Sequence, residues 1–252
     1  MKESKNKNVR GKSRRKAKVE SGQGREIKSK FQEERKQRLP PIQAMNDNQK
    51  RYFQVLRTEK LIIASGAAGT GKTFIPCALA ADAFLRGDIE KIIIARPPVE
   101  MGKSIGFRKG TELEKLEPFL RPMLDTIKKR VGCATYEIML STKQLEIQSL
   151  DAIRGRSFDE PCLVLVDEGQ NCEPSEIRSI VTRIGADCQM VLCGDPDQTD
   201  IKGLNGMQYI TNIVNKYTIP DTALITFTED DIVRSPMAKE FVIAFRKEKE
   251  VA

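Results

Sequence analysis

An apolar run passes directly into a glycine-rich loop in the stretch L-I-I-A-S-G-A-A-G-T-G-K-T, residues 61–73. Residues 66–73 match the pattern G-x-x-x-x-G-K-[ST], in which backbone N–H groups and the start of the following helix surround phosphate groups. This spacing predicts a strand, a loop and a helix in succession. The residues expected to hold a nucleotide are Gly66, Ala67, Ala68, Gly69, Thr70, Gly71, Lys72 and Thr73.

Two side chains of the loop have specific expected roles. The Lys72 ammonium should reach the β- and γ-phosphate oxygens, and the Thr73 hydroxyl should bind Mg²⁺. A glycine-rich turn that precedes a lysine by chance is the structural alternative, but the predicted strand and helix on either side favour the phosphate-binding interpretation.

Outward from this loop, short apolar runs alternate with longer helical stretches. Continuous apolar strands separated by helices indicate a parallel sheet covered on both faces. We therefore predict an α/β fold with three layers and a mostly parallel sheet. The expected strands are 61–65, 91–95, 162–166, 189–193 and 223–227, and the expected helices are 46–57, 72–86, 111–130, 174–184, 205–216 and 236–247. Residues 133–156 read as a small inserted hairpin or a loop.

Two carboxylates follow the apolar strand at 162–166. Asp167 and Glu168 would stand at the carboxyl end of a buried strand, where parallel α/β sheets bind their ligands. Asp167 is expected to hold Mg²⁺ through water, and Glu168 to polarise an attacking water molecule. Two adjacent acids favour hydrolysis over binding alone.

The next apolar strand leads into G-D-P-D-Q-T-D, residues 194–200. Taken alone, this segment reads as a turn, because Gly, Asp and Pro are common turn residues. At the carboxyl end of a neighbouring strand, however, the Gln198 amide could bond both the γ-phosphate and the lytic water.

The charge of the chain is concentrated at its start. Residues 1–40 contain 15 Lys and Arg against 5 Asp and Glu, whereas the remaining residues carry a net charge of −2. A segment of this composition cannot bury enough apolar surface to order itself. We predict a disordered basic arm over 1–40, able to attract RNA, DNA or anionic lipid, and a nucleotide-binding domain over 41–252.

The composition also excludes several chemistries and compartments. The chain has no histidine, so Ser-His-Asp triads, Cys-His pairs and imidazole metal ligands are excluded. Its six cysteines form no C-x-x-C pair and read as reduced thiols, which favours the cytoplasm. We expect no membrane span, because no apolar stretch is long enough.

Several blocks together resemble the PhoH family of P-loop ATPases, which are similar to the motor core of superfamily-one helicases. The resemblance covers about residues 41–247. It rests on G-A-A-G-T-G-K-T (66–73), A-R-P-P-V-E-M-G (95–102), G-F-R-K-G with a later E-K (106–115), I-R-G-R-S-F (153–158), V-D-E-G-Q-N (166–171), T-R-I-G (182–185), G-D-P-D-Q-T-D (194–200) and D-I-V-R-S-P (231–236).

The resemblance implies a RecA-like core that uses ATP and Mg²⁺. It also matches Gln49 to a glutamine that reads adenine, although on spacing alone an exposed helix residue is an equal interpretation. The chain departs from the family at Arg108-Lys109-Gly110, where Leu-Pro-Gly is typical, and at Gly169, where alanine is typical. Phage-encoded members resemble this short form, so a viral origin, and with it the host cytoplasm, is part of the expectation.

Phosphoryl transfer needs a cation on the transferring group, and two arginines are candidates for it. These are Arg183 in T-R-I-G and Arg234 in D-I-V-R-S-P. If a neighbouring subunit supplies the arginine, the protein is a homo-oligomer, with a hexameric ring among the arrangements considered. Arg96, Arg154 and Arg156, which we place away from the nucleotide loop, read as surface residues or as contacts to a nucleic-acid backbone.

The leading hypothesis is a Mg²⁺-dependent ATPase coupled to binding or remodelling of RNA or single-stranded DNA, with helicase-type activity as one form. The alternative is an ATP-gated oligomer that binds nucleic acid with negligible hydrolysis. A small-molecule kinase is a third reading, weakened by the lack of a recognisable acceptor site. Glu229, Asp230 and Asp231 read as acids near a helix start rather than as a metal cluster.

Overall fold

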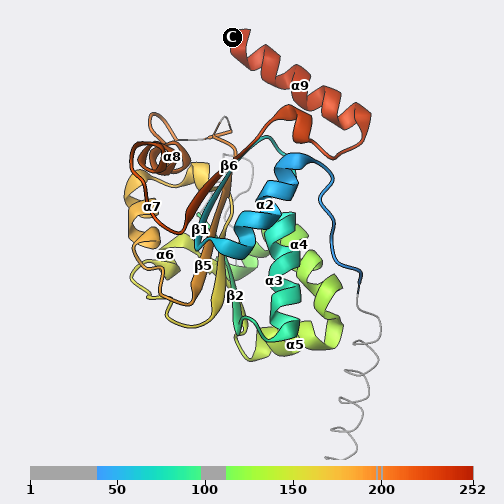
Figure 1. Ribbon diagram of the computed structural model, residues 1–252, viewed down its shortest axis with the longest axis vertical. Coiled ribbons are helices and arrows are strands. Elements are labelled where there is room, and N and C mark those ends of the chain that lie inside the picture. The colour runs from blue at the N-terminus through green and yellow to red at the C-terminus, as the bar shows by residue number, and fades with distance from the viewer. Residues whose placement is uncertain (1–38, 98–111, 197, 200, 252) are drawn as a thin grey trace, which may run out of the picture.

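A six-stranded parallel sheet forms the centre of the protein (Figure 1). The computed structural model describes residues 39–97, 112–196, 198–199 and 201–251. The strand order is β3-β2-β4-β5-β1-β6, and every neighbouring pair is parallel. The strands are β1 (Leu61–Gly66), β2 (Lys91–Arg96), β3 (Leu145–Ser149), β4 (Cys162–Val166), β5 (Cys188–Gly194) and β6 (Thr222–Phe227).

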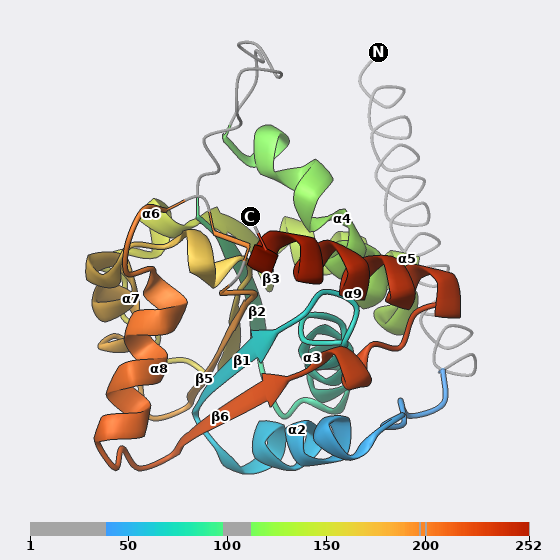
Figure 2. The same ribbon diagram turned by 90° about the horizontal axis from the view of Figure 1, so that it is seen from above.

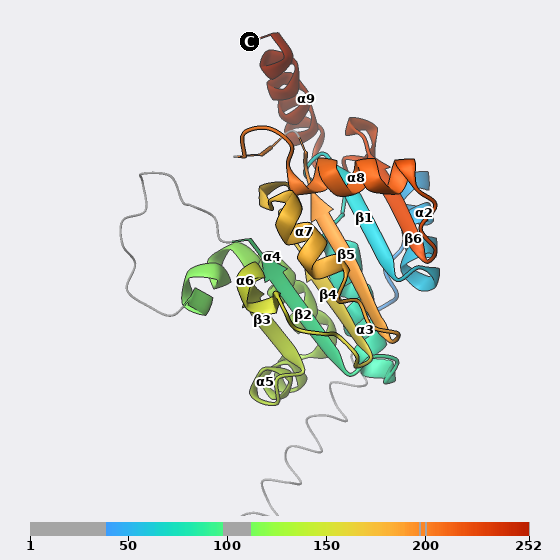
Figure 3. The same ribbon diagram turned by 90° about the vertical axis from the view of Figure 1, so that its left-hand side faces the viewer.

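Helices cover both faces of the sheet, which makes three layers. On one face lie α2 (Asp47–Thr58), α3 (Phe74–Arg86), α4 (Glu112–Val131) and α5 (Cys133–Ser141). On the other lie α6 (Leu150–Ile153), α7 (Pro174–Val181) and α8 (Gly206–Lys216) (Figure 3). The remaining elements are the short 3₁₀ turns η1 (Gly169–Asn171) and η2 (Glu229–Asp231) and the helix α9 (Pro236–Val251).

Alternate residues of each strand enter two separate hydrophobic cores. In β1, Ile62 packs toward the α2–α5 side and Ile63 toward the α6–α8 side, and both are fully buried. The same alternation holds in β4, where Leu165 and Val164 face opposite sides. Because both faces are dry, the central strands are continuously apolar, as a covered parallel sheet requires.

The strand order brings three loops to one edge of the sheet. β5 lies between β1 and β4, with Ser65 opposite Gly194 and Val166 opposite Leu192. The loop after β1, the acids after β4 and the turn after β5 therefore emerge side by side at the carboxyl ends of the strands. This edge is the place where open α/β sheets bind ligands.

The predicted α/β architecture is confirmed, and five strands and six helices lie where the sequence places them, within a few residues. The prediction of a hairpin or loop over 133–156 is wrong, because that stretch forms α5, β3 and α6. As the edge strand, β3 carries the polar Glu146 and Gln148 and lacks a continuous apolar signal. Two predictions lie outside the described residues. One is the basic arm, of which only Leu39 and Pro40 are described, and the other is the segment 108–110, where the sequence differs from the family pattern.

No helix in the described part of the chain combines the length and apolar character needed to cross a bilayer. Helix α9 stands apart from the other helices (Figure 1), and in the view from above it crosses in front of them (Figure 2). This helix also carries Arg246, which pairs with Asp195 directly after the carboxyl end of β5. Three large apolar side chains on it, Met237, Phe241 and Phe245, are 70%, 54% and 68% exposed. Their spacing of four residues places them on one side of the helix.

Replacing Gly66 by alanine should disrupt the junction between β1 and the loop. A Cβ on Gly66 (φ +128°) would lie 2.0 Å from the Phe227 backbone oxygen, and neither strand can move away without breaking the sheet. Gly87 (φ +82°) is the matched control, because a Cβ there meets nothing within 4 Å. We expect Gly87→Ala to cost about 1 kcal/mol from left-handed strain alone, and Gly66→Ala at least about 3 kcal/mol. Equal losses of unfolding free energy in urea would contradict this.

Candidate nucleotide-binding site

The loop between β1 and α3 forms a cradle around the Lys72 side chain. The Lys72 ammonium donates to the backbone oxygens of Gly66 and Ala67, both at 2.6 Å. The side chain is only 8% exposed, and this burial lowers the pKa of the ammonium. Phosphate oxygens are stronger acceptors for a buried cation than neutral carbonyls are. The ammonium is thus placed to exchange these carbonyls for phosphate.

The two residues predicted to bind Mg²⁺ meet across the edge of the sheet. The Thr73 hydroxyl, at the start of α3, donates to Asp167 Oδ1 at 3.1 Å. A hydroxyl and a carboxylate in contact supply the hard oxygen ligands that Mg²⁺ prefers, with its remaining positions left to water and phosphate. The residues present therefore fit this ion. No group of three or more His, Cys, Asp or Glu residues within the described ranges forms any other metal site.

Asp167 lies in an unfavourable environment for its charge. Burial, followed by the neighbouring Glu168 carboxylate, raises the pKa of Asp167 above its usual value, and Arg96 and the Thr73 hydroxyl oppose this shift. Glu168 itself adopts a left-handed backbone conformation (φ 55°, ψ 39°), which is uncommon for a residue with a side chain. Such strained positions concentrate at functional sites.

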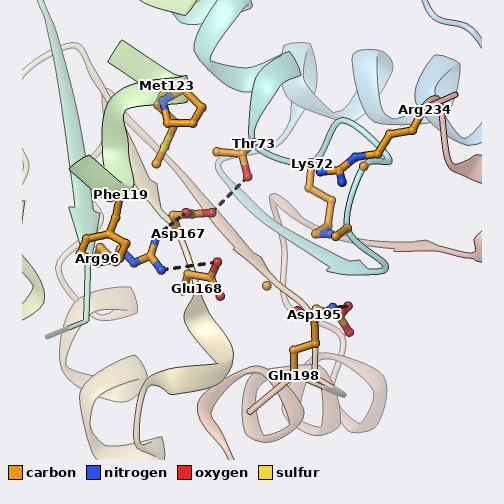
Figure 4. A pocket seen from close by; sticks show the side chains of 14 residues that line it. Lys72, Thr73, Arg96, Phe119, Met123, Asp167, Glu168, Asp195, Gln198 and Arg234 are labelled. Atoms are coloured by element: carbon orange, nitrogen blue, oxygen red, sulfur yellow. Dashed lines mark hydrogen bonds and ion pairs between the residues drawn. The ribbon is translucent and has the colours of Figure 1, made fainter. Parts of the chain in front are cut away.

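A cavity of about 320 Å³ opens between the loop, the acids and the turn after β5 (Figure 4). Eight residues predicted from the sequence line it: Ala68, Gly69, Lys72, Thr73, Asp167, Glu168, Gln198 and Arg234. Six others also line it: Arg96, Phe119, Pro122, Met123, Gly194 and Asp195. The predicted loop residues Gly66, Ala67, Thr70 and Gly71 build the backbone of the cradle behind this lining.

Arg96 lies inside this site, contrary to its predicted position away from the nucleotide loop. Its guanidinium stands 3.5 Å from Asp167 Oδ2 and 3.7 Å from Glu168 Oε1, and it stacks over the Phe119 ring at 5.1 Å. The prediction failed because β2 pairs with β4, which brings Arg96 beside the acids. Arg154 and Arg156 do lie outside the cavity. Arg154 forms ion pairs with Asp151 and Glu176. Arg156 forms ion pairs with Glu146 and Glu160.

Gln170 is a site residue that we did not single out in the sequence. Its side chain is 1% exposed, and its amide nitrogen donates to Glu168 Oε2 and to the Gln198 backbone oxygen. Its amide oxygen accepts from the Asp195 backbone N–H at 3.0 Å. One side chain thus joins the acid after β4 to the turn after β5. The sequence signals were its place two residues after Glu168 and its position in the block V-D-E-G-Q-N (166–171).

Gln198 stands on that turn and contributes to the lining of the cavity. Its amide nitrogen donates to Asp195 Oδ2 at 2.9 Å. Asp195 is buried and also pairs with Arg246 of α9 at 3.5 Å. Gln198 therefore lines the same cavity as Lys72 and Glu168, and its role as a sensor of the γ-phosphate stays a prediction.

Gln49 is buried beneath the loop rather than exposed on α2. Its amide nitrogen donates to the Thr70 backbone oxygen at 2.9 Å, and its amide oxygen accepts from the Met45 N–H at 2.8 Å. It therefore ties the start of α2 to the phosphate loop, and it is absent from the cavity lining. Adenine reading by Gln49 stays a prediction.

The two candidate arginines lie at different edges of the sheet. Arg234 lines the cavity of its own chain and packs so closely on Gly69 that a Cβ there would lie 2.6 Å from Arg234 Nε. Arg183 is exposed after α7, and its backbone oxygen accepts from Phe158, which precedes the amino end of β4. Arg183 is thus far from the cavity of its own chain.

The acids at 229–231 have a structural role. Asp231 is buried, and its Oδ2 accepts from the Thr228 N–H and from Asn48 Nδ2, both at 2.8 Å. These bonds cap η2 and connect it to α2. The interpretation as acids near a helix start, rather than a metal cluster, agrees with this geometry.

A phosphate cradle on one strand and an acid pair on another, with a polar turn between them, define this protein as a P-loop NTPase. The family model described as "PhoH-like protein" matches residues 41–246. The chain therefore belongs to the PhoH-like protein family.

Named relatives support this assignment. A "PhoH-like protein" of Bacillus subtilis is 33% identical over 208 residues, which cover 82% of this chain and 65% of that protein. "Protein PhoH" of Escherichia coli is 30% identical over 209 residues, which cover 81% of this chain and 58% of that protein. The chain thus spans less than two thirds of the length of these relatives.

Solved structures with a similar arrangement are more distant. One is the Pif1 helicase from Candida albicans, with a TM-score of 0.35, 15% identity, and coverage of 75% of this chain and 41% of that one. Another is the N-terminal domain of the DNA packaging ATPase from bacteriophage phi29, with a TM-score of 0.42, 13% identity, and coverage of 75% and 98%.

Met207 of α8 packs against Gly169, one of the positions where we noted a departure in the sequence. A Cβ on Gly169 would lie 2.8 Å from Met207 Sδ and 3.3 Å from the Cys193 backbone oxygen. Because the thioether is flexible, we expect Gly169→Ala to cost only about 1 kcal/mol of unfolding free energy. In a Met207→Ala background the same change should cost less, as a double-mutant cycle by urea unfolding will show. An identical cost in both backgrounds would refute this packing explanation.

Lowering the pH should weaken the contribution of Mg²⁺ to ATP binding through Asp167. A carboxyl group with a raised pKa takes up its proton at a higher pH than an ordinary aspartate, and the protonated group binds Mg²⁺ poorly. The Mg²⁺-dependent gain in ATP affinity should therefore fall as the pH is lowered, and should do so at a higher pH than an ordinary aspartate would give. Calorimetric titrations at decreasing pH test the effect, and Asp167→Asn should remove it. A gain that is constant with pH would contradict the assignment.

Proposed function

We propose that the protein hydrolyses ATP with the help of Mg²⁺ and couples this reaction to RNA or single-stranded DNA. The observation that carries the proposal is the contact between Thr73 and Asp167 at the mouth of the cavity, with Glu168 and Lys72 on either side. Ligands for a metal, a cation for phosphate and a base for water converge there. A site for binding alone has no need of the last group.

The residues of the cavity have separate roles in this reaction. Lys72 and Arg234 hold the negative charge of the phosphates, and Thr73 and Asp167 would hold Mg²⁺, which supplies further neutralisation of the γ-phosphate when bound. Glu168 accepts a proton from water as the water oxygen bonds to the γ-phosphorus. The bond from that phosphorus to the bridging oxygen breaks, and ADP keeps the electron pair. Gln198 orients the water.

Coupling to nucleic acid is supported by the charge distribution of the sequence. The surplus of positive charge lies in residues 1–40, and neutralisation of backbone phosphates by Lys and Arg favours binding of any polynucleotide. The six cysteines of the chain are free thiols, which supports the cytoplasm as the compartment of this activity.

A homo-oligomeric ring is part of the proposal. Arg234 acts within its own subunit, so Arg183 is the candidate that a neighbouring subunit would supply in trans. The exposed side chains of Met237, Phe241 and Phe245 on α9 offer an apolar surface for such a neighbour. Size-exclusion chromatography without nucleotide, with ADP and with ATP tests this part, and a monomer in all three conditions would contradict it.

One observation favours the alternative of an ATP-gated binding protein with negligible hydrolysis. Glu168 accepts a hydrogen bond from Gln170 on one oxygen and faces the Arg96 guanidinium with the other, so both carboxylate oxygens already have a partner. A site locked in this arrangement would bind ATP without activating water. Phosphate release measured beside the chromatography separates the two functions.

Alanine substitutions at Lys72 and Glu168 should separate binding from hydrolysis. Lys72→Ala should abolish detectable ATP binding, because the buried ammonium is the central cation of the cradle. Glu168→Ala should keep ATP affinity and lower kcat by about 10²- to 10⁴-fold, the contribution of a general base. Phosphate release and nucleotide titration measure both effects, with and without RNA or single-stranded DNA.

The exposed residues Lys129 and Glu117 provide controls on α4. Their alanine variants should match the wild type in binding and turnover. Unchanged turnover in both Lys72→Ala and Glu168→Ala would defeat the proposed function.

A further inference from the structure

Every carboxylate oxygen of the acid pair already has a partner within the described chain. Asp167 Oδ1 accepts from Thr73, and Oδ2 faces the Arg96 guanidinium at 3.5 Å. Glu168 Oε1 faces the same guanidinium at 3.7 Å, and Oε2 accepts from the Gln170 amide. Figure 4 shows the two acids between Arg96 on one side and Lys72 and Arg234 on the other. Glu168 therefore has to release one partner before it can accept a water molecule.

Arg96 is the partner that is held most weakly. Its contacts of 3.5 and 3.7 Å exceed the 2.7–2.9 Å of a strong charge-assisted hydrogen bond. Its Nε is buried and has no hydrogen-bond acceptor among the described residues. Gln170, in contrast, is fixed by Asp195 and Gln198 as well as by Glu168. A guanidinium with a vacant donor gains by moving toward an anion.

The backbone fixes the base of Arg96 beside the acids while its side chain can reorient. Ala95 pairs with Val166 across β2 and β4, and the Asp167 N–H donates to the Ala95 oxygen at 2.9 Å. Arg96 is the last residue of β2 and precedes Pro97, which favours extended backbone. Its side chain is 13% exposed at the cavity, so an anion that enters there can reach it.

We propose that Arg96 is a positioning residue that restrains Glu168 in the resting site and releases it when a phosphate group draws the guanidinium away. This inference rests on the proposed hydrolysis of ATP and adds its regulation. The phosphate comes either from the nucleotide or from a nucleic-acid backbone. In the first case release accompanies ATP binding, and in the second case turnover rises only when RNA or DNA is present.

Replacing Arg96 by glutamine tests the restraint. If nucleic acid supplies the phosphate, Arg96→Gln should raise the kcat of phosphate release without nucleic acid by about 3- to 10-fold, since a weak ion pair no longer opposes activation of Glu168, and the affinity for a non-hydrolysable ATP analogue should stay within about twofold. If ATP supplies the phosphate, the wild type is already released at saturating ATP, so kcat should stay near the wild-type value and the affinity for the analogue should fall, because the variant loses a contact to the nucleotide. Arg96→Lys keeps the charge and should retain the low resting rate.

Further variants exclude indirect effects. Arg156→Gln removes a paired arginine outside the cavity and should leave the rate unchanged. Arg96→Gln combined with Glu168→Gln should be inactive, because the gain acts through Glu168. Thermal unfolding of each variant identifies loss of fold. If Arg96→Gln is unstable, Arg96→Lys provides the test, and its resting rate should be at or near that of the wild type.

Turnover measured with and without nucleic acid distinguishes the two possible sources of phosphate. Stimulation by single-stranded RNA or DNA that shrinks in Arg96→Gln assigns release to the polynucleotide, whereas equal stimulation in both proteins assigns it to ATP. A lower resting kcat in stable Arg96→Gln, a resting kcat and an analogue affinity that are both unchanged, or a resting rate in Arg96→Lys raised as far as in Arg96→Gln, would overturn the restraint while leaving the proposed function intact. Absence of hydrolysis in the wild type and in every variant would instead overturn both.

Discussion

The hydrogen bond between Thr73 and Asp167 is the contact on which the site depends. It joins the first turn after the phosphate loop to the carboxyl end of β4, although a whole strand, β5, lies between β1 and β4 in the sheet. The strand order makes this possible, because all three strands end at the same edge. A cradle for phosphate and a pair of acids thereby become one cavity.

The same edge also connects the cavity to the rest of the molecule. Gln170 links Glu168 to the turn after β5, and Arg246 links Asp195 on that turn to α9. Arg96 carries the connection outward to β2. Each link is a polar contact beside the cavity, whereas the helices behind it are held by apolar packing on both faces of the sheet. Movement at the site can thus occur without disturbing the cores.

Local sequence patterns were sufficient to predict a structural element where the residues that determine it lie in one continuous segment. The central strands are apolar throughout because both their faces are buried, and the phosphate loop is a contiguous motif. Prediction failed where pairing between distant segments decides the outcome. The edge strand β3 was missed because Glu146 and Gln148 interrupt its apolar pattern. Arg96 was misplaced because only the pairing of β2 with β4 brings it to the acids. Gln170 was overlooked because its contacts to the turn after β5 depend on the pairing of β4 with β5.

We propose that nucleotide and Mg²⁺ bind together where Thr73 meets Asp167. Calorimetric titration of ATP into the protein, with Mg²⁺ and with a chelator, tests this most directly when Thr73→Val is titrated in parallel. Binding should be tighter with Mg²⁺ in the wild type, and most of that gain should be lost in Thr73→Val. No binding heat in the wild type, or the same dependence on Mg²⁺ in both proteins, would contradict it.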